Sequence, residues 1–164
     1  MALNSLHDVY VDQLQDLYSA CDQSLDITQK LADAATDADL KEALTRGVAG
    51  IERGKDTLRD LIKGHNADPE GEHCKGMEGL VKEAQAHGLD QEFGDDAARD
   101  AMIVTQYQRM AHYAIAGYGC CKAFADRMDH SSDAAHLQKC LDSAYKGDQQ
   151  MSDVATGGIN QDAA

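Results

Sequence analysis

Apolar residues recur about once per helical turn through the first 62 residues of the chain. Such spacing is typical of one face of an amphipathic helix. The first stripe predicts a helix over 4–35 and the second a helix over 37–63. Thr36-Asp37 then forms a short turn that caps the second helix. Two long helices joined by so short a turn must be antiparallel neighbours. The stripes are Leu6, Tyr10, Leu14, Leu17, Cys21, Leu25, Thr28 and Ala32, followed by Leu40, Leu44, Val48, Ile51, Leu58 and Ile62.

The stretch 64–94 breaks this pattern and reads as a long crossover. It begins with a Gly/Asn/Asp segment that holds the only proline, which is typical of a loop. A short amphipathic helix follows over 74–86, and Gly88 is expected to end it. Further helices are predicted over 95–128 and 132–154. Two helices, a long crossover and two more helices indicate an all-α, ferritin-like four-helix bundle.

The expected domain organisation is one bundle domain over 1–155, followed by a polar, disordered tail over 156–164. The net charge of −14 argues against nucleic acid and anionic membranes as partners. No apolar stretch approaches the ~20 residues of a membrane span, and no export signal is visible, so we expect a cytoplasmic protein. The five cysteines form no CxxC pair, which leaves zinc-ribbon and thioredoxin folds without support.

Three segments carry a family resemblance. They are Asp16-Leu17-Tyr18-Ser19-Ala20, Cys74-Lys75-Gly76-Met77-Glu78-Gly79-Leu80, and a helix-three motif of His112-Tyr113, Ile115-Ala116 and Tyr118-Gly119. Together they resemble the YciE/YciF-type ferritin-like proteins, a bacterial stress-associated family. The resemblance implies a compact bundle, often a homodimer, with a two-metal site between the helices.

The resemblance also implies where the metal ligands should stand, and this chain departs from it there. Four to six inward-facing carboxylates and imidazoles are needed for two hard cations. The corresponding positions are Cys21, Gly50, Gly54, Ala111, Ala114 and Ala144. No acidic residue occurs between Asp100 and Asp126, and no predicted helix contains Glu-x-x-His. We therefore expect no di-iron site.

Small residues line the same region. Gly47, Gly50 and Gly54 fall on one face of the second helix, although each glycine costs a helix about 0.8–1 kcal/mol relative to alanine. Ala111, Ala114 and Gly117 repeat the pattern, as do Ala144 and Gly147. One explanation is close helix packing; the other is a cavity for an organic ligand, on which neighbouring tyrosines could stack.

The leading hypothesis is a non-enzymatic protein that binds a small hydrophobic or aromatic molecule, or an organic cofactor, in the vacated core. The predicted cavity residues are Cys21, Gly47, Gly50, Gly54, Tyr107, Met110, Ala111, Ala114, Tyr118, Ala144 and Asp148. Another hypothesis is a metal-dependent stress-response oxidase or metal-binding protein. Its metal site would be either a di-metal site or a soft-metal site of Cys21, His112, Cys121 and Cys140. Buried cysteines acting as small hydrophobes explain the same residues. A third hypothesis is a structural stress protein that acts through its surface or as a dimer.

Overall fold

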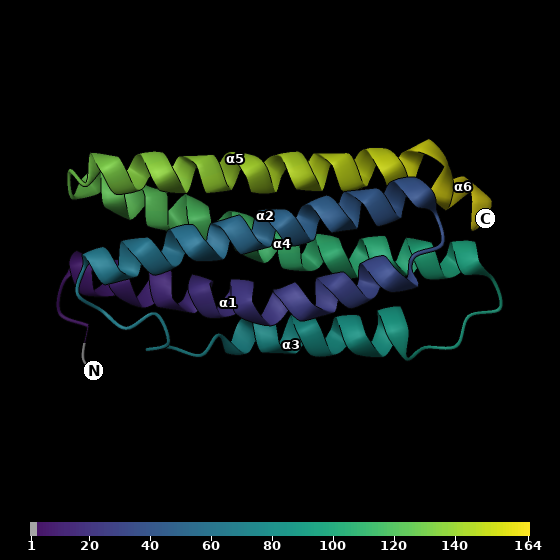
Figure 1. The fold of residues 1–164 in the computed structure, drawn as a ribbon, viewed down its shortest axis with the longest axis horizontal. Helices are drawn as coiled ribbons and strands as arrows, with labels where there is room; N and C mark the ends of the chain where they lie inside the picture. The colour runs from purple at the N-terminus through teal and green to yellow at the C-terminus, as the bar shows by residue number, and fades with distance from the viewer. Residues whose placement is uncertain (1–2) are drawn as a thin grey trace.

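Four long helices dominate the computed structural model, which describes residues 3–164 (Figure 1). Each begins and ends within two residues of the sequence prediction, and no strand occurs in the described part of the chain. The long helices are α1 (Leu6–Ala34), α2 (Ala38–Gly64), α4 (Asp96–Arg127) and α5 (Ser131–Val154). The shorter α3 (Lys75–Ala84) lies in the crossover. The predicted all-α fold class is confirmed.

Side-chain caps account for several helix starts. Asp37 accepts a hydrogen bond from the Leu40 amide at 2.8 Å, as the Thr36-Asp37 turn predicts. Ser5 does the same for α1, and the Cys74 sulfur accepts from the Met77 amide at the start of α3. Each bond satisfies an amide that has no partner inside its own helix.

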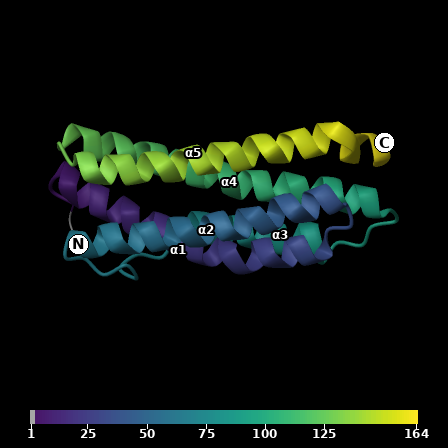
Figure 2. The same cartoon turned by 45° about the horizontal axis from the view of Figure 1, so that its top comes forward.

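The four long helices form a bundle in which α1 and α5 each pack against α2 and α4. Figures 1 and 2 show that packed neighbours run antiparallel, so α1 and α5 point one way and α2 and α4 the other. Helix α3 lies against α1 and α4 on the outside of the bundle. As a result, the start of α1, the end of α2 and the α4–α5 turn meet at one end.

The core consists of two apolar clusters along the bundle axis. One includes Leu31, Leu44 and Tyr107, and the other includes Leu14 and Tyr118. All five side chains are at most 7% exposed. Burying such side chains is the main stabilising contribution to a bundle of this size.

A buried carboxylate ties the first turn to α4. Asp100 is 2% exposed and accepts hydrogen bonds from the amides of Thr36 and Asp37, at 3.0 and 2.7 Å. The Thr36 hydroxyl donates a third bond at 2.7 Å. This contact fixes the α1–α2 turn against the start of α4.

Two expectations differ from the structure. The tail expected to be disordered continues as a π-helical turn (Ala155–Ile159) and α6 (Asn160–Asp162). Ile159 is buried because it extends the four-residue spacing of Met151 and Ala155 against α4. Gly88 does not end α3 but lies inside a second π-helical turn (Gln85–Leu89), where a Cβ atom would stand 2.9 Å from a Leu31 methyl group.

None of the helices within residues 3–164 combines the length and apolarity that a bilayer crossing requires.

Candidate functional site

Two tyrosines of α4 occupy the space beside the glycine face of α2. A Cβ atom built on Gly47 would lie 2.6 Å from the hydroxyl oxygen of Tyr107. One built on Gly54 would lie closer still to the hydroxyl of Tyr118. Tyr107 is 7% exposed and Tyr118 4%. At these two positions the glycines are explained by the tyrosines packed on them.

The small residues of α5 serve the same packing. A Cβ atom on Gly147 would stand 3.6 Å from the Tyr107 hydroxyl, so this group lies between α2 and α5. Gly50 differs, because the nearest side-chain atom to its Cβ position is the Ser143 hydroxyl at 3.8 Å. Of the other predicted cavity residues, Met110 is buried, whereas Ala111, Ala114, Ala144 and Asp148 are half-buried.

The buried thiol of Cys21 lies 3.5 Å from the Tyr118 hydroxyl. Burial raises the pKa of Cys21 to about 11, so it is a neutral thiol near pH 7. Burial, with the charge of Asp148, also raises the pKa of Tyr107 to about 12. Cys21 and Tyr118 therefore form an uncharged contact inside the bundle. A neutral thiol is a poor nucleophile, because the thiolate is the reactive form.

The structure does not bring the predicted soft-metal ligands together. The His112 side chain is 64% exposed and pairs with Asp148 at 3.0 Å, away from the cysteines. Cys21, Cys121 and Cys140 instead belong to the apolar cluster that includes Tyr118. Burial raises the pKa of Cys121 to about 12. Within residues 3–164 the four side chains do not form a group of ligand atoms close enough for one ion.

The residues at mid-height also do not fit a two-metal centre. Carboxylate-bridged centres in such bundles use four Glu and two His residues that project inward. Here Asp148 is a half-buried carboxylate that already binds His112 and the Gln108 amide. The positions at which the resemblance implies ligands carry Cys, Gly and Ala. No chemical step is therefore assigned to a metal pair.

The three family-like segments meet where α3 docks on the bundle. The Cys74 thiol donates to the Tyr113 hydroxyl at 3.0 Å, and that hydroxyl donates to Asp16 at 2.8 Å. The Cys74 amide donates to the Ser19 hydroxyl at 3.0 Å. A Cβ atom on Gly76 would lie 2.8 Å from the Tyr113 ring. The segments thus hold the crossover helix in place.

Comparison with known proteins places this arrangement in a family. A family model described as a domain of unknown function, DUF892, matches residues 5–164. The chain belongs to the DUF892 family. Protein YciF of Escherichia coli (strain K12) is 26% identical over 164 residues, which cover 99% of this chain and 98% of that protein. The resemblance noted from the sequence is confirmed.

Two solved structures share the fold of this DUF892 chain. One is described as YcfI, a putative structural protein from Rhodopseudomonas palustris; it matches with a TM-score of 0.84 at 27% identity, over 91% of this chain and 94% of that one. The other is the E. coli stress protein YciF, with a TM-score of 0.88 at 24% identity, over 97% and 99% of the two chains. The helical fold is therefore shared along nearly the whole DUF892 chain.

Sequence reasoning missed one group of side chains in this DUF892 protein. His7, His65 and His130 converge at one end of the bundle, although 58 and 65 residues separate them in sequence. These spacings match no short metal-binding motif. The one signal in the sequence was topological, since all three stand at predicted helix ends that an up-down-down-up bundle brings together.

Proposed function

We propose that this DUF892 chain is a non-enzymatic structural protein of the bacterial stress-protein type. The observation that carries the proposal is the placement of the Tyr107 and Tyr118 hydroxyls in the space beside Gly47 and Gly54. Side chains of the protein itself occupy that part of the core. The descriptions of the two similar structures, a putative structural protein and a stress protein, support the same interpretation.

The docking of α3 adds a second line of support. The segments that carry the family resemblance make hydrogen bonds between α1, α4 and the crossover. The Tyr113 hydroxyl stays protonated in this network, because burial and the contacts with Cys74 and Asp16 raise its pKa. These residues stabilise the architecture.

Aerobic addition of Fe²⁺ to metal-free protein tests this proposal against the oxidase alternative. We expect iron oxidation no faster than in buffer, and fewer than two ions retained per chain after desalting. Oxidation with two retained ions, both lost in Asp148→Asn, would overturn the proposal. Asp148 is the chosen variant because it is the half-buried carboxylate among the predicted cavity residues. Asp153→Asn, at an exposed position of the same helix, is the matched control.

The predicted ligand-binding core is the second candidate. It is favoured by the room at Gly50, where the side-chain atom nearest to the Cβ position is 3.8 Å away. Half-buried Ala111, Ala114 and Ala144 are further predicted cavity residues. Native mass spectrometry and the absorption spectrum of purified protein test it. A bound aromatic compound that Gly50→Leu displaces would support this candidate, and an unmodified mass with no visible absorption would refute it.

The proposal also includes a homodimer, which the family resemblance implies, and a cytoplasmic location. All five cysteines are free within the described residues, as expected in a reducing compartment. Sedimentation equilibrium should return twice the 17.7 kDa mass of one chain. A mass of one chain at micromolar concentration would contradict the dimer.

A further inference from the structure

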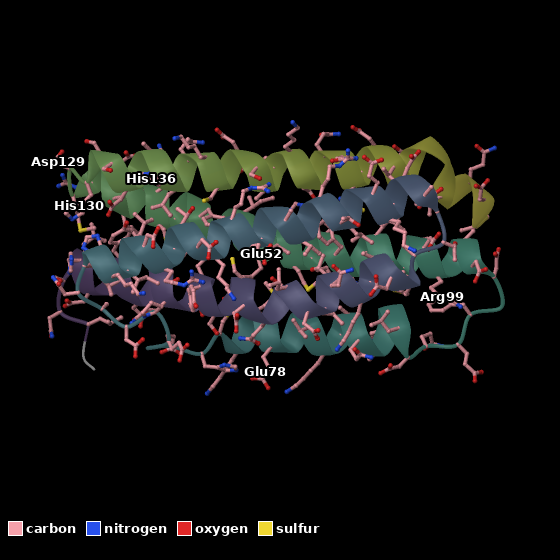
Figure 3. All side chains as sticks on the ribbon, in the orientation of Figure 1. Glu52, Glu78, Arg99, Asp129, His130 and His136 are labelled. Carbon is pink, nitrogen blue, oxygen red and sulfur yellow. The ribbon has the colours of Figure 1, made fainter. Side chains whose placement is uncertain are left out.

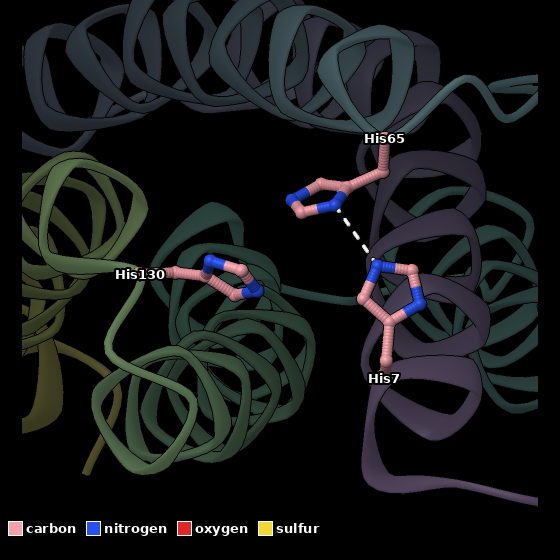
Figure 4. Close-up of side chains that lie close together, drawn as sticks. All are labelled: His7, His65 and His130. Atoms are coloured by element: carbon pink, nitrogen blue, oxygen red, sulfur yellow. Dashed lines mark hydrogen bonds between the residues drawn. The ribbon is translucent and has the colours of Figure 1, made fainter.

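Three imidazoles from three separate elements meet at the end of the bundle where the α4–α5 turn lies (Figure 4). His7 stands in the first turn of α1, His65 directly follows α2, and His130 lies in the turn before α5. One ring nitrogen of each is within 4.8 Å of those of the other two. Figure 3 shows His130 beside Asp129 at this end.

Two of these rings already stand at a spacing suited to one ion. His7 Nε2 lies 3.1 Å from His65 Nδ1. Two imidazole nitrogens on a tetrahedral Zn²⁺ lie about 3.3 Å apart, given Zn–N bonds of about 2.0–2.1 Å. His7 is exposed and free to adjust. His130 is held by its backbone, because its amide donates to the Ala125 carbonyl at 2.9 Å.

A half-buried carboxylate orients the central histidine. Asp133 Oδ2 lies 2.8 Å from His65 Nε2 and accepts a hydrogen bond from the hydroxyl of Tyr10, a fully buried residue, at 3.1 Å. A hydrogen bond from Nε2–H to Asp133 leaves the lone pair of His65 Nδ1 directed at His7. Histidines that bind metals usually donate their second N–H to a carboxylate in this way. The Asp133 and His65 side chains are only 19% and 14% exposed.

We propose that His7, His65 and His130 bind one divalent transition-metal ion of the zinc class, with Asp133 as the outer carboxylate. Imidazole nitrogens suit Zn²⁺, Cu²⁺ and Ni²⁺, whereas Mg²⁺ and Ca²⁺ prefer oxygen. Three protein ligands leave a fourth position for water. A pocket of about 490 Å³ beside His65 and His130 gives that position access to solvent.

The charge of the surroundings favours a cation. The pocket beside the cluster is also lined by Asp60, Asp129 and Asp133, and the whole chain carries a net charge of −14. Negative groups around an opening raise the local concentration of cations. Without a metal, the same geometry would be an imidazole hydrogen bond beside Tyr10, whose ring lies 5.4 Å from that of His65. A metal site and simple ring packing therefore differ in whether the protein binds Zn²⁺.

Calorimetric titration of chelator-treated protein with Zn²⁺ separates the two. We expect one ion per chain, and a loss of at least 100-fold in affinity for His65→Gln and, as a second variant, His130→Gln. Asp133→Asn should weaken binding by about 10–100-fold. His87→Gln, an exposed histidine on a π-helical turn outside the cluster, is the matched control and should bind as the parent does. Circular dichroism checks that each variant is folded.

Cobalt substitution identifies the donor atoms. A Co²⁺ derivative bound by imidazole nitrogens should show visible d–d bands without thiolate charge-transfer absorption, which excludes the cysteines as ligands. The proposal is overturned if folded His65→Gln and His130→Gln bind Zn²⁺ as the parent does. It is also overturned if the parent binds no Zn²⁺ at micromolar concentration, or if the cobalt spectrum carries a thiolate signature.

Discussion

Replacing Gly54 by alanine tests whether Tyr118 fills the core beside α2. The new methyl group would meet the Tyr118 hydroxyl oxygen well inside contact distance, while the next nearest atom is the ring carbon Cζ at 3.5 Å. In a Tyr118→Phe background the obstructing oxygen is gone and only an ordinary contact remains. The effect of Gly54→Ala should therefore depend on the side chain at position 118.

The expected energies follow from two opposing effects. Alanine stabilises a helix interior by about 0.8–1 kcal/mol relative to glycine. Forcing an extra methyl group into a filled core costs about 1–3 kcal/mol. Gly54→Ala should thus be neutral to destabilising by about 2 kcal/mol in the parent, but stabilising by about 1 kcal/mol in the Tyr118→Phe background. The coupling free energy between the two positions is then about 1–3 kcal/mol.

Urea denaturation of the four members of this cycle measures the coupling, and Gly50→Ala is the control. Gly50 has no side-chain atom closer than 3.8 Å to its Cβ position, so alanine there should stabilise the protein through helix propensity alone. A coupling near zero, with Gly54→Ala as stabilising as Gly50→Ala, would refute the packing of Tyr118 on α2. That result would instead indicate free space at this height of the bundle.

Three further predictions concern single groups. Asp100→Ala removes the acceptor of three hydrogen bonds at the α1–α2 turn and should destabilise the protein by about 2–4 kcal/mol in urea denaturation; a loss below about 1 kcal/mol would contradict it. The pKa of Tyr107 is raised from 10.0 to about 12. The neutral phenol therefore contributes up to about 3 kcal/mol to the free energy of unfolding; this contribution is complete below pH 10 and is lost as the pH rises towards 12. Tyr107→Phe should flatten this alkaline fall in stability, and an unchanged slope would argue against the raised pKa. Cys120 is the exposed thiol, so native protein should show one fast reaction with a thiol reagent, absent in Cys120→Ser, while buried Cys21 reacts only on unfolding.

The helices were predictable because periodicity and caps are local. Asp37 both follows the end of one apolar stripe and caps the next helix, and the sequence shows both features. A disordered tail was expected because residues 156–158 are Thr-Gly-Gly. They obscure Ile159, the one large apolar residue of the tail, which continues the buried face. The contact of Asp100 with the α1–α2 turn was not predictable from the sequence, because its partners lie 63 and 64 residues away along the chain.

The candidate site was predictable in part for a similar reason. The glycine face of α2 is visible in the sequence, but whether it opens on a cavity or on a tyrosine depends on side-chain directions on α4. Gly47 and Tyr107 are paired only by the register of two helices that no short turn connects. The histidine cluster depends on three helix ends meeting, and this follows from topology rather than from any motif.

An anomalous difference map from a crystal grown with Zn²⁺ would show the bundle interior and the histidine end together. We expect a peak among His7, His65 and His130, and tyrosine rings packed on Gly47 and Gly54 with no peak beside them. A metal peak or unexplained density at mid-height, between Cys21 and Ala111, would contradict this expectation.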